Sequence, residues 1–141
     1  EALKKIEGIG LSNLICHYKF LASGIRKAIE EMGLTIFTQE NARSDVLTVV
    51  NSPKGIHPSA IVQEIRKNYG VLIAGGQGEI ADKVFRIATI GAIGERDVIS
   101  VIGLLELALV KLGFLREPGK GTTAILKHFC ERQNEKALYF S

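Results

Sequence analysis

The chain has 141 residues, of which 46% are hydrophobic and 23% are charged, and its formal net charge is +3. These totals are typical of a globular domain that is long enough to bury a core. The small, scattered excess of positive charge argues against a nucleic-acid-binding surface, and no apolar run is long enough to cross a membrane. We therefore expect one globular domain whose partners include neither nucleic acid nor a membrane.

Cysteine usage and the first residues bear on location and completeness. Cys16 and Cys130 stand far apart and outside any C-x-x-C spacing, as free thiols in a reducing compartment do. No signal peptide is recognisable, so the sequence predicts a cytoplasmic protein. The segment that starts at Glu1 reads as the end of a helix already under way, which predicts that the chain is an excerpt of a longer protein.

The first half of the chain predicts two helices followed by two strands. A short charged helix over residues 1–6 ends at glycines. A long helix follows over residues 13–32, where apolar residues recur every three or four positions along one stripe. Gly33 suits the left-handed residue that ends a helix. Residues 34–38 and 46–50 are rich in β-branched side chains and predict two strands.

The second half predicts a helix, two strands and two further helices. A helix begins at Pro58, because a first helical position does not need the N–H that proline lacks. Apolar runs at residues 71–74 and 84–90 predict strands on either side of a glycine-rich turn. A helix over residues 95–112 has acidic residues in its first turn, and a last helix over residues 124–136 follows a linker. The order predicts an α/β (α+β) sandwich, with a small, mostly antiparallel sheet and helices packed on one face.

One arginine, Arg86, stands inside an apolar strand, between Phe85 and Ile87. A guanidinium keeps its charge and offers five N–H donors in a flat fork, so burying it without an anion is costly. The strand therefore leaves Arg86 at a wet edge, pairs it with a carboxylate of its own domain, or directs it at the carboxylate or phosphate of a ligand.

The stretch from Tyr69 to Gly91, with its glycine-rich turn and the tripeptide around Arg86, resembles the small C-terminal domain of the class V aminotransferases. These are fold-type I pyridoxal phosphate enzymes that include serine–pyruvate and alanine–glyoxylate aminotransferases. The pattern H-x-x-x-L-A-x-x-I-R that begins at His17 is also similar to that family. The similarity covers residues 14–113, although Ala88 stands where the family usually has a glycine.

The resemblance implies a small domain at residues 1–115, a linker and appended helix at residues 116–141, and a large domain outside this chain. It implies that pyridoxal 5'-phosphate is bound mainly by that large domain, together with the Schiff-base lysine, so that this chain holds no catalytic residue. It also implies that Arg86 binds the α-carboxylate of the substrate. Gly75 and Gly76 are candidates for a loop at the mouth of the active site, where they would leave space for substrate.

The function implied by the resemblance is transfer of an amino group from a small amino acid to a 2-oxo acid such as glyoxylate or pyruvate. Serine, alanine and aspartate are all open as donors, and the family works as a homodimer with active sites between subunits. This chain on its own should then be inactive. The alternative is a free-standing α/β module that binds a small carboxylate through Arg86, or binds another protein, without catalysis.

Two glycine-rich segments suggest phosphate binding at first sight. Residues 76–81 fit G-x-G-x-x-A after a strand, but only a few residues separate them from the next strand, which leaves no room for the helix of a dinucleotide site. Residues 118–122, PGKGT, lack both the spacing and the Ser or Thr after lysine of a phosphate-binding loop. We expect a tight turn at the first segment and a solvated linker at the second.

The histidines and cysteines do not form a recognisable metal or nucleophile motif. His17, His57 and His128 stand apart, without metal-ligand spacing, so we expect no metal site. Cys16 and Cys130 lie in helical patterns, whereas the related cysteine desulfurases carry a reactive cysteine on a loop of this domain. This difference argues against the desulfurase subgroup.

Overall fold

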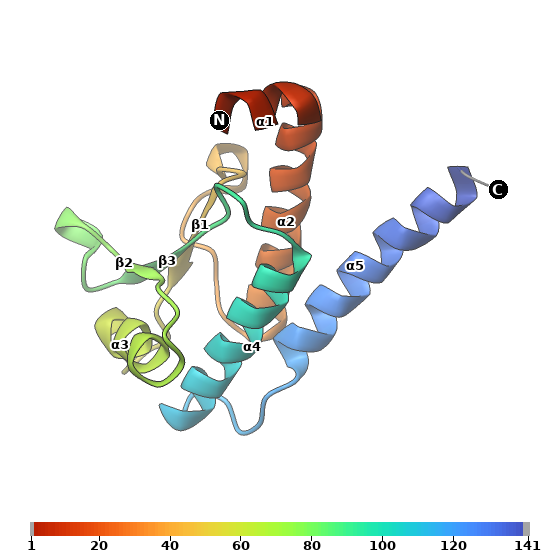
Figure 1. The fold of residues 1–141 in the computed structure, drawn as a ribbon. Coiled ribbons are helices and arrows are strands. Elements are labelled where there is room, and N and C mark those ends of the chain that lie inside the picture. The colour runs from red at the N-terminus through yellow and green to blue at the C-terminus, as the bar shows by residue number, and fades with distance from the viewer. Residues whose placement is uncertain (1, 140–141) are drawn as a thin grey trace.

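The computed structural model describes the backbone of residues 2–139, and side-chain burial for nearly all residues up to 132. Its helices are α1 (Ala2–Ile9), α2 (Leu11–Glu31), α3 (Pro58–Tyr69), α4 (Glu95–Lys111) and α5 (Lys120–Tyr139). Its strands are β1 (Leu47–Asn51), β2 (Ala74–Gly75) and β3 (Val84–Ala88), and the short 3-10 turns are η1 (Glu40–Ala42) and η2 (Gly78–Ile80). Figure 1 shows α2 and α4 lying beside a small sheet, with α3 near β2 and β3, while α5 extends away from the sheet.

The sheet has three antiparallel strands in the order β1-β3-β2. β1 and β3 pair along five residues, with Val49 opposite Arg86 and Val50 opposite Phe85. β2 and β3 pair at only two positions, Ala74 with Arg86 and Gly75 with Phe85. The predicted small antiparallel sheet with helices on one face is therefore confirmed.

Side chains on the two faces of this sheet have different surroundings, because successive residues of a strand point to opposite sides. Val50, Phe85 and Ile87 lie in the buried core beneath the helices. Val49 and Arg86 consequently lie on the other face, which the core helices do not cover. The alternation of β3 thus explains how a charged residue sits between two buried apolar ones.

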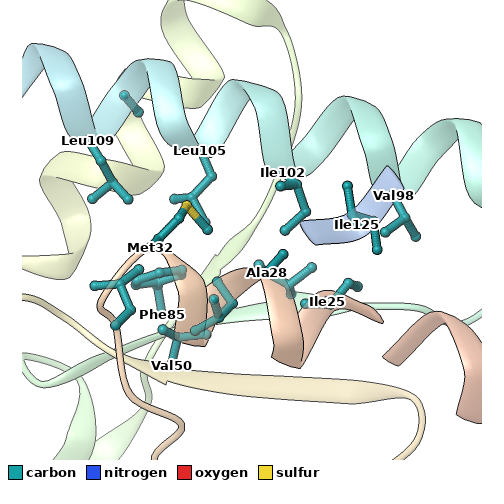
Figure 2. Packing of buried hydrophobic residues seen from close by; sticks show 14 of the residues in the cluster. Ile25, Ala28, Met32, Val50, Phe85, Val98, Ile102, Leu105, Leu109 and Ile125 are labelled. Carbon is teal, nitrogen blue, oxygen red and sulfur yellow. The ribbon is translucent and has the colours of Figure 1, made fainter. Parts of the chain in front are cut away.

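The core is built mainly between α2, α4 and the inner face of the sheet (Figure 2). Ile25 of α2 and Met32, the residue that follows α2, meet Ile102 and Leu105 of α4. The aromatic ring of Phe85 closes the space toward the sheet. All five are at most 3% exposed. The apolar stripes predicted for these two helices are the surfaces that pack here.

Two of the predicted strands are shorter than expected. Residues 34–38 run along the edge of β1 through one bridge, Ile36 to Val50, and a bond from the Asn51 N–H to the Thr35 carbonyl at 2.9 Å, without forming a regular strand. Of the predicted strand at residues 71–74, only Ala74 belongs to β2. Residues 71–73 do not pair with β3, although their apolar composition is that of a strand.

The last helix begins at Lys120, four residues before the predicted start, and so includes part of the expected linker. The cause is Glu106 of α4, whose buried carboxylate accepts bonds from the Gly121 N–H at 2.6 Å and the Thr122 hydroxyl at 2.5 Å. A carboxylate at this position satisfies N–H groups that the first turn of a helix leaves unpaired. Ile125 of α5 is fully buried, so the first half of α5 shares the core of the preceding segment.

Candidate functional site

Arg86 is half-buried on the outer face of β3, and its Nε donates a hydrogen bond of 2.7 Å to the carbonyl of Gly75. Among the side chains that the structure describes, no carboxylate oxygen lies within 4.0 Å of the guanidinium. Of the three arrangements open to this arginine, pairing with a carboxylate of its own domain is therefore not the one observed. One backbone carbonyl engages one of its five donors.

A cleft of about 410 Å³ opens beside Arg86. It lies where residues 71–73 leave β3 unpaired, and Ile25 of α2 and the first turns of α4 form its far wall. Its lining is mostly aliphatic and includes Val71, Ile73, Ile87 and Val101. The short β2 ladder, which sequence patterns did not predict, is what creates this space.

The charges around the cleft are few. Arg86 is the one cationic side chain among the described residues that line it, and Asp97 is the one carboxylate. Asp97 is already engaged, because it accepts a 2.9 Å bond from the Gly94 N–H and so caps the start of α4. The cleft therefore offers a small anion one cation, beside a wall that suits apolar atoms.

The two glycines next to Arg86 have different surroundings. Gly75 lies in β2 and supplies the carbonyl that holds Arg86, and a Cβ added to it would meet no atom within 4 Å. Gly76 is packed tightly: a Cβ there would overlap the Ile80 carbonyl and lie 3.0 Å from the Cα of Ala81. Neither glycine is among the residues that line the cleft.

Two residues of α2 that sequence analysis did not assign to the site hold the loop between β3 and α4. The Tyr18 hydroxyl donates to the Gly91 carbonyl at 2.9 Å and accepts from the Gly91 N–H at 3.1 Å. His17 Nε2 lies 2.9 Å from the Ile93 carbonyl oxygen. Ile93 lines the cleft, so this pair fixes part of its wall. Sequence patterns do not reveal this role of His17, because the partner loop is more than seventy residues away in sequence.

The remaining sequence motifs lie outside the cleft. The turn after Gly76 is followed by η2 and then β3, with no helix, so the expectation of a tight turn in place of a dinucleotide site is confirmed. In the PGKGT segment, the first turn of α5 is occupied by the carboxylate of Glu106. Cys16 and Cys130 are free and exposed, and neither lines the Arg86 cleft.

The structure also adds information on metals and membranes. Within the part of the chain that it describes, histidine, cysteine and carboxylate side chains do not gather in groups of three that could hold a metal ion. None of the described helices combines the length and the hydropathy that a bilayer crossing requires. His57 lies at the start of α3, and its Nδ1 caps the helix by accepting from the Ser59 N–H at 3.3 Å.

No protein-family model matches the chain. Over 111 residues, which are 78% of this chain and 29% of the relative, it is 37% identical to an uncharacterized aminotransferase of Methanocaldococcus jannaschii. Over 124 residues, which are 87% of this chain and 31% of the relative, it is 32% identical to serine–glyoxylate aminotransferase of Arabidopsis thaliana.

The fold is also similar to a solved structure. The crystal structure of ureidoglycine–glyoxylate aminotransferase from Bacillus subtilis superposes with a TM-score of 0.85 and 26% sequence identity, covering 89% of this chain and 33% of that one. The chain thus spans about a third of the length of each of these relatives.

Proposed function

We propose that this chain, whose relatives are named as aminotransferases, is the small domain of a class V, pyridoxal phosphate-dependent aminotransferase in which Arg86 binds the α-carboxylate of the substrate. The reaction is transfer of an amino group from a small amino acid to a 2-oxo acid. Serine is the donor and glyoxylate the acceptor that the name of the Arabidopsis relative supports. The observation that carries the proposal is a half-buried guanidinium, with no carboxylate partner among the described side chains, at the rim of an open cleft.

The residues that the structure describes do not form a pyridoxal phosphate site by themselves. Every lysine whose burial is described is exposed, and no described lysine lines the Arg86 cleft, whereas a Schiff-base lysine is placed in a cofactor pocket. In the proposal the cofactor is bound by parts of the enzyme outside this chain, and two subunits form the enzyme. When bound, pyridoxal phosphate supplies the electron sink for the chemistry at the Cα of the amino acid.

The role of Arg86 is to bind and orient. A planar guanidinium donates two parallel hydrogen bonds to the two oxygens of one carboxylate, which fixes the direction of the Cα as well as its distance. Orienting the substrate in this way lowers the entropic part of the barrier. The ammonium of a lysine is a point charge without that fork, so it holds the carboxylate less well.

The test is the steady-state kinetics of Arg86→Ala, Arg86→Lys and Arg66→Ala in the enzyme that contains this chain. Hydrogen bonds to charged groups contribute about 1.5–3 kcal/mol each, so losing two should lower kcat/KM at least about a hundredfold, through a much higher KM and a lower kcat. Arg86→Lys should recover part of this loss. Arg66 is exposed in the last turn of α3, and its substitution should leave kcat/KM unchanged. Wild-type kinetics in Arg86→Ala would contradict the proposal.

A further inference from the structure

The guanidinium of Arg86 has two edges that can hold a carboxylate. One edge presents Nε and a terminal nitrogen, and the other presents the two terminal nitrogens. The Nε–H already donates to the Gly75 carbonyl at 2.7 Å, a normal distance for a strong bond. The first edge is therefore occupied by the protein, and the end with the two terminal nitrogens remains for a ligand.

The Gly75 carbonyl owes its place to the turn that follows β2. The N–H of Gly76 donates to the Val84 carbonyl at 2.9 Å, which continues the short ladder between β2 and β3. The η2 turn then folds back, and its Ile80 carbonyl lies against the Cα of Gly76. That carbonyl is itself fixed, since it accepts a 3.1 Å bond from the Lys83 N–H.

No residue with a side chain fits at position 76 without moving this backbone. An added Cβ would overlap the Ile80 carbonyl, and the main chain is held by hydrogen bonds at both Gly76 and Ile80. Gly75 offers a direct contrast, because a Cβ there meets open space. Neither glycine has a positive φ, so an alanine is strained at neither position by its backbone angles.

We propose that Gly76 is a positioning residue for Arg86: its missing side chain lets η2 seat β2 so that the Gly75 carbonyl holds Nε, which turns the terminal nitrogens toward the substrate carboxylate. The proposal rests on the proposed function in one respect, namely that a carboxylate is what the terminal nitrogens bind. It differs from the expectation that both glycines leave space for substrate, because that expectation treats positions 75 and 76 alike.

The experiment uses the ¹⁵N-labelled chain and measures solvent exchange of the arginine Nε–H protons by NMR, with Arg86→Lys identifying the Arg86 signal. In the wild type this proton should exchange about tenfold more slowly than that of Arg96, the factor expected for one intramolecular hydrogen bond. The Arg96 side chain is 93% exposed and serves as the internal reference. Gly76→Ala should raise the Arg86 rate to that of Arg96, whereas Gly75→Ala should leave it within about twofold of the wild type.

The inference is overturned if Gly76→Ala keeps the slow exchange, or if Gly75→Ala abolishes it equally. The altered turn lies outside the core, so the Gly76→Ala variant should fold. A second variant, Gly78→Ala, strains the same turn through a φ of 57° without a steric clash. It should therefore accelerate exchange of the Arg86 Nε–H in part. Adding acetate separates this inference from the proposed function. Binding to the terminal nitrogens shifts their signals and leaves the Nε–H in slow exchange, whereas displacement of the Nε–H by acetate contradicts the inference. If none of the Arg86 signals changes when acetate is added, the result counts against the proposed function only.

Discussion

At the scale of single residues, His128 shows how burial changes the chemistry of a side chain. It is 7% exposed, its ring stacks on that of Phe20 with centroids 4.4 Å apart, and its Nε2 lies 3.0 Å from the Phe20 carbonyl oxygen. Its buried Nδ1 has no hydrogen-bond partner among the described residues. Burial lowers the pKa of His128, the bond to Phe20 opposes this in part, and the nearby charges of Lys27, Glu131 and Arg132 partly cancel.

This lowered pKa predicts a pH dependence of stability. An unfolded histidine takes up its proton near pH 6.5, whereas folded His128 does so only at lower pH. The contribution of neutral His128 to the free energy of unfolding is therefore fully present above about pH 6.5. It is lost as the pH drops toward the folded pKa, because the unfolded state then binds more protons. Urea unfolding at pH 7.5 and pH 5 should show this loss, and His128→Gln should reduce it.

The matched control is His57→Gln, because His57 is exposed at the start of α3. That variant should keep the wild-type difference between the two pH values. An unchanged pH dependence in His128→Gln would show that the stability change arises from other groups.

At the scale of elements, the contact between α2 and α5 depends on a glycine. A Cβ added to Gly24 would lie 2.5 Å from Ile125 Cδ1 and 2.6 Å from His128 Cδ2. Gly103, in the middle of α4, has room, since its Cβ would lie 3.9 Å from the nearest atom, Thr122 Oγ1. The two positions therefore separate helix propensity from packing.

Alanine at these two glycines should have opposite effects on the free energy of unfolding. Gly103→Ala should stabilise by up to about 1 kcal/mol, because alanine is the better helix former. Gly24→Ala gains the same propensity but forces α5 away from α2, so it should destabilise by about 1–3 kcal/mol. Urea unfolding at constant pH measures both, and a stabilised Gly24→Ala variant would show that α2 and α5 are not in close contact there.

Sequence patterns predicted those helices and strands whose bounds depend on residues only a few positions apart. The stripes of α2 and α4, and the start of α3 at Pro58, follow from residues a few positions apart. The ends of β2 and α5 do not, because they depend on partners distant in sequence. The early start of α5 is set by Glu106, a carboxylate inside an apolar stripe, and that anomaly was the available signal.

The same limit applies to the candidate site. The charge of Arg86 within an apolar strand marks the residue in the sequence, and strand alternation places it on the outer face. Its bond to Gly75 follows from the register of β2 against β3, which no short pattern contains. The contributions of Tyr18 and His17 to the cleft wall come from contacts across more than seventy residues.

At the scale of the whole molecule, the proposed site lies at the edge of the sheet, next to the core that stabilises it. The inner face packs Phe85 and Ile87 beneath the helices, while Arg86 leaves the outer face at the rim of a cleft that Ile87 and the first turns of α4 also line. A rigid core behind the arginine fixes the strand that carries it, which is what precise orientation of a carboxylate requires. The cofactor and the second substrate surface belong, in the proposal, to the rest of the enzyme.

The most direct measurement of the central claim is the preference of the enzyme for serine over ethanolamine, which is serine without its carboxylate. The affinities of both compounds are measured in the wild type, in Arg86→Ala and in Arg66→Ala. If Arg86 holds the carboxylate, its removal should lower the preference for serine about a hundredfold, with little change in the affinity for ethanolamine, while Arg66→Ala keeps the wild-type preference. An Arg86→Ala enzyme that still prefers serine to the wild-type extent would contradict the account.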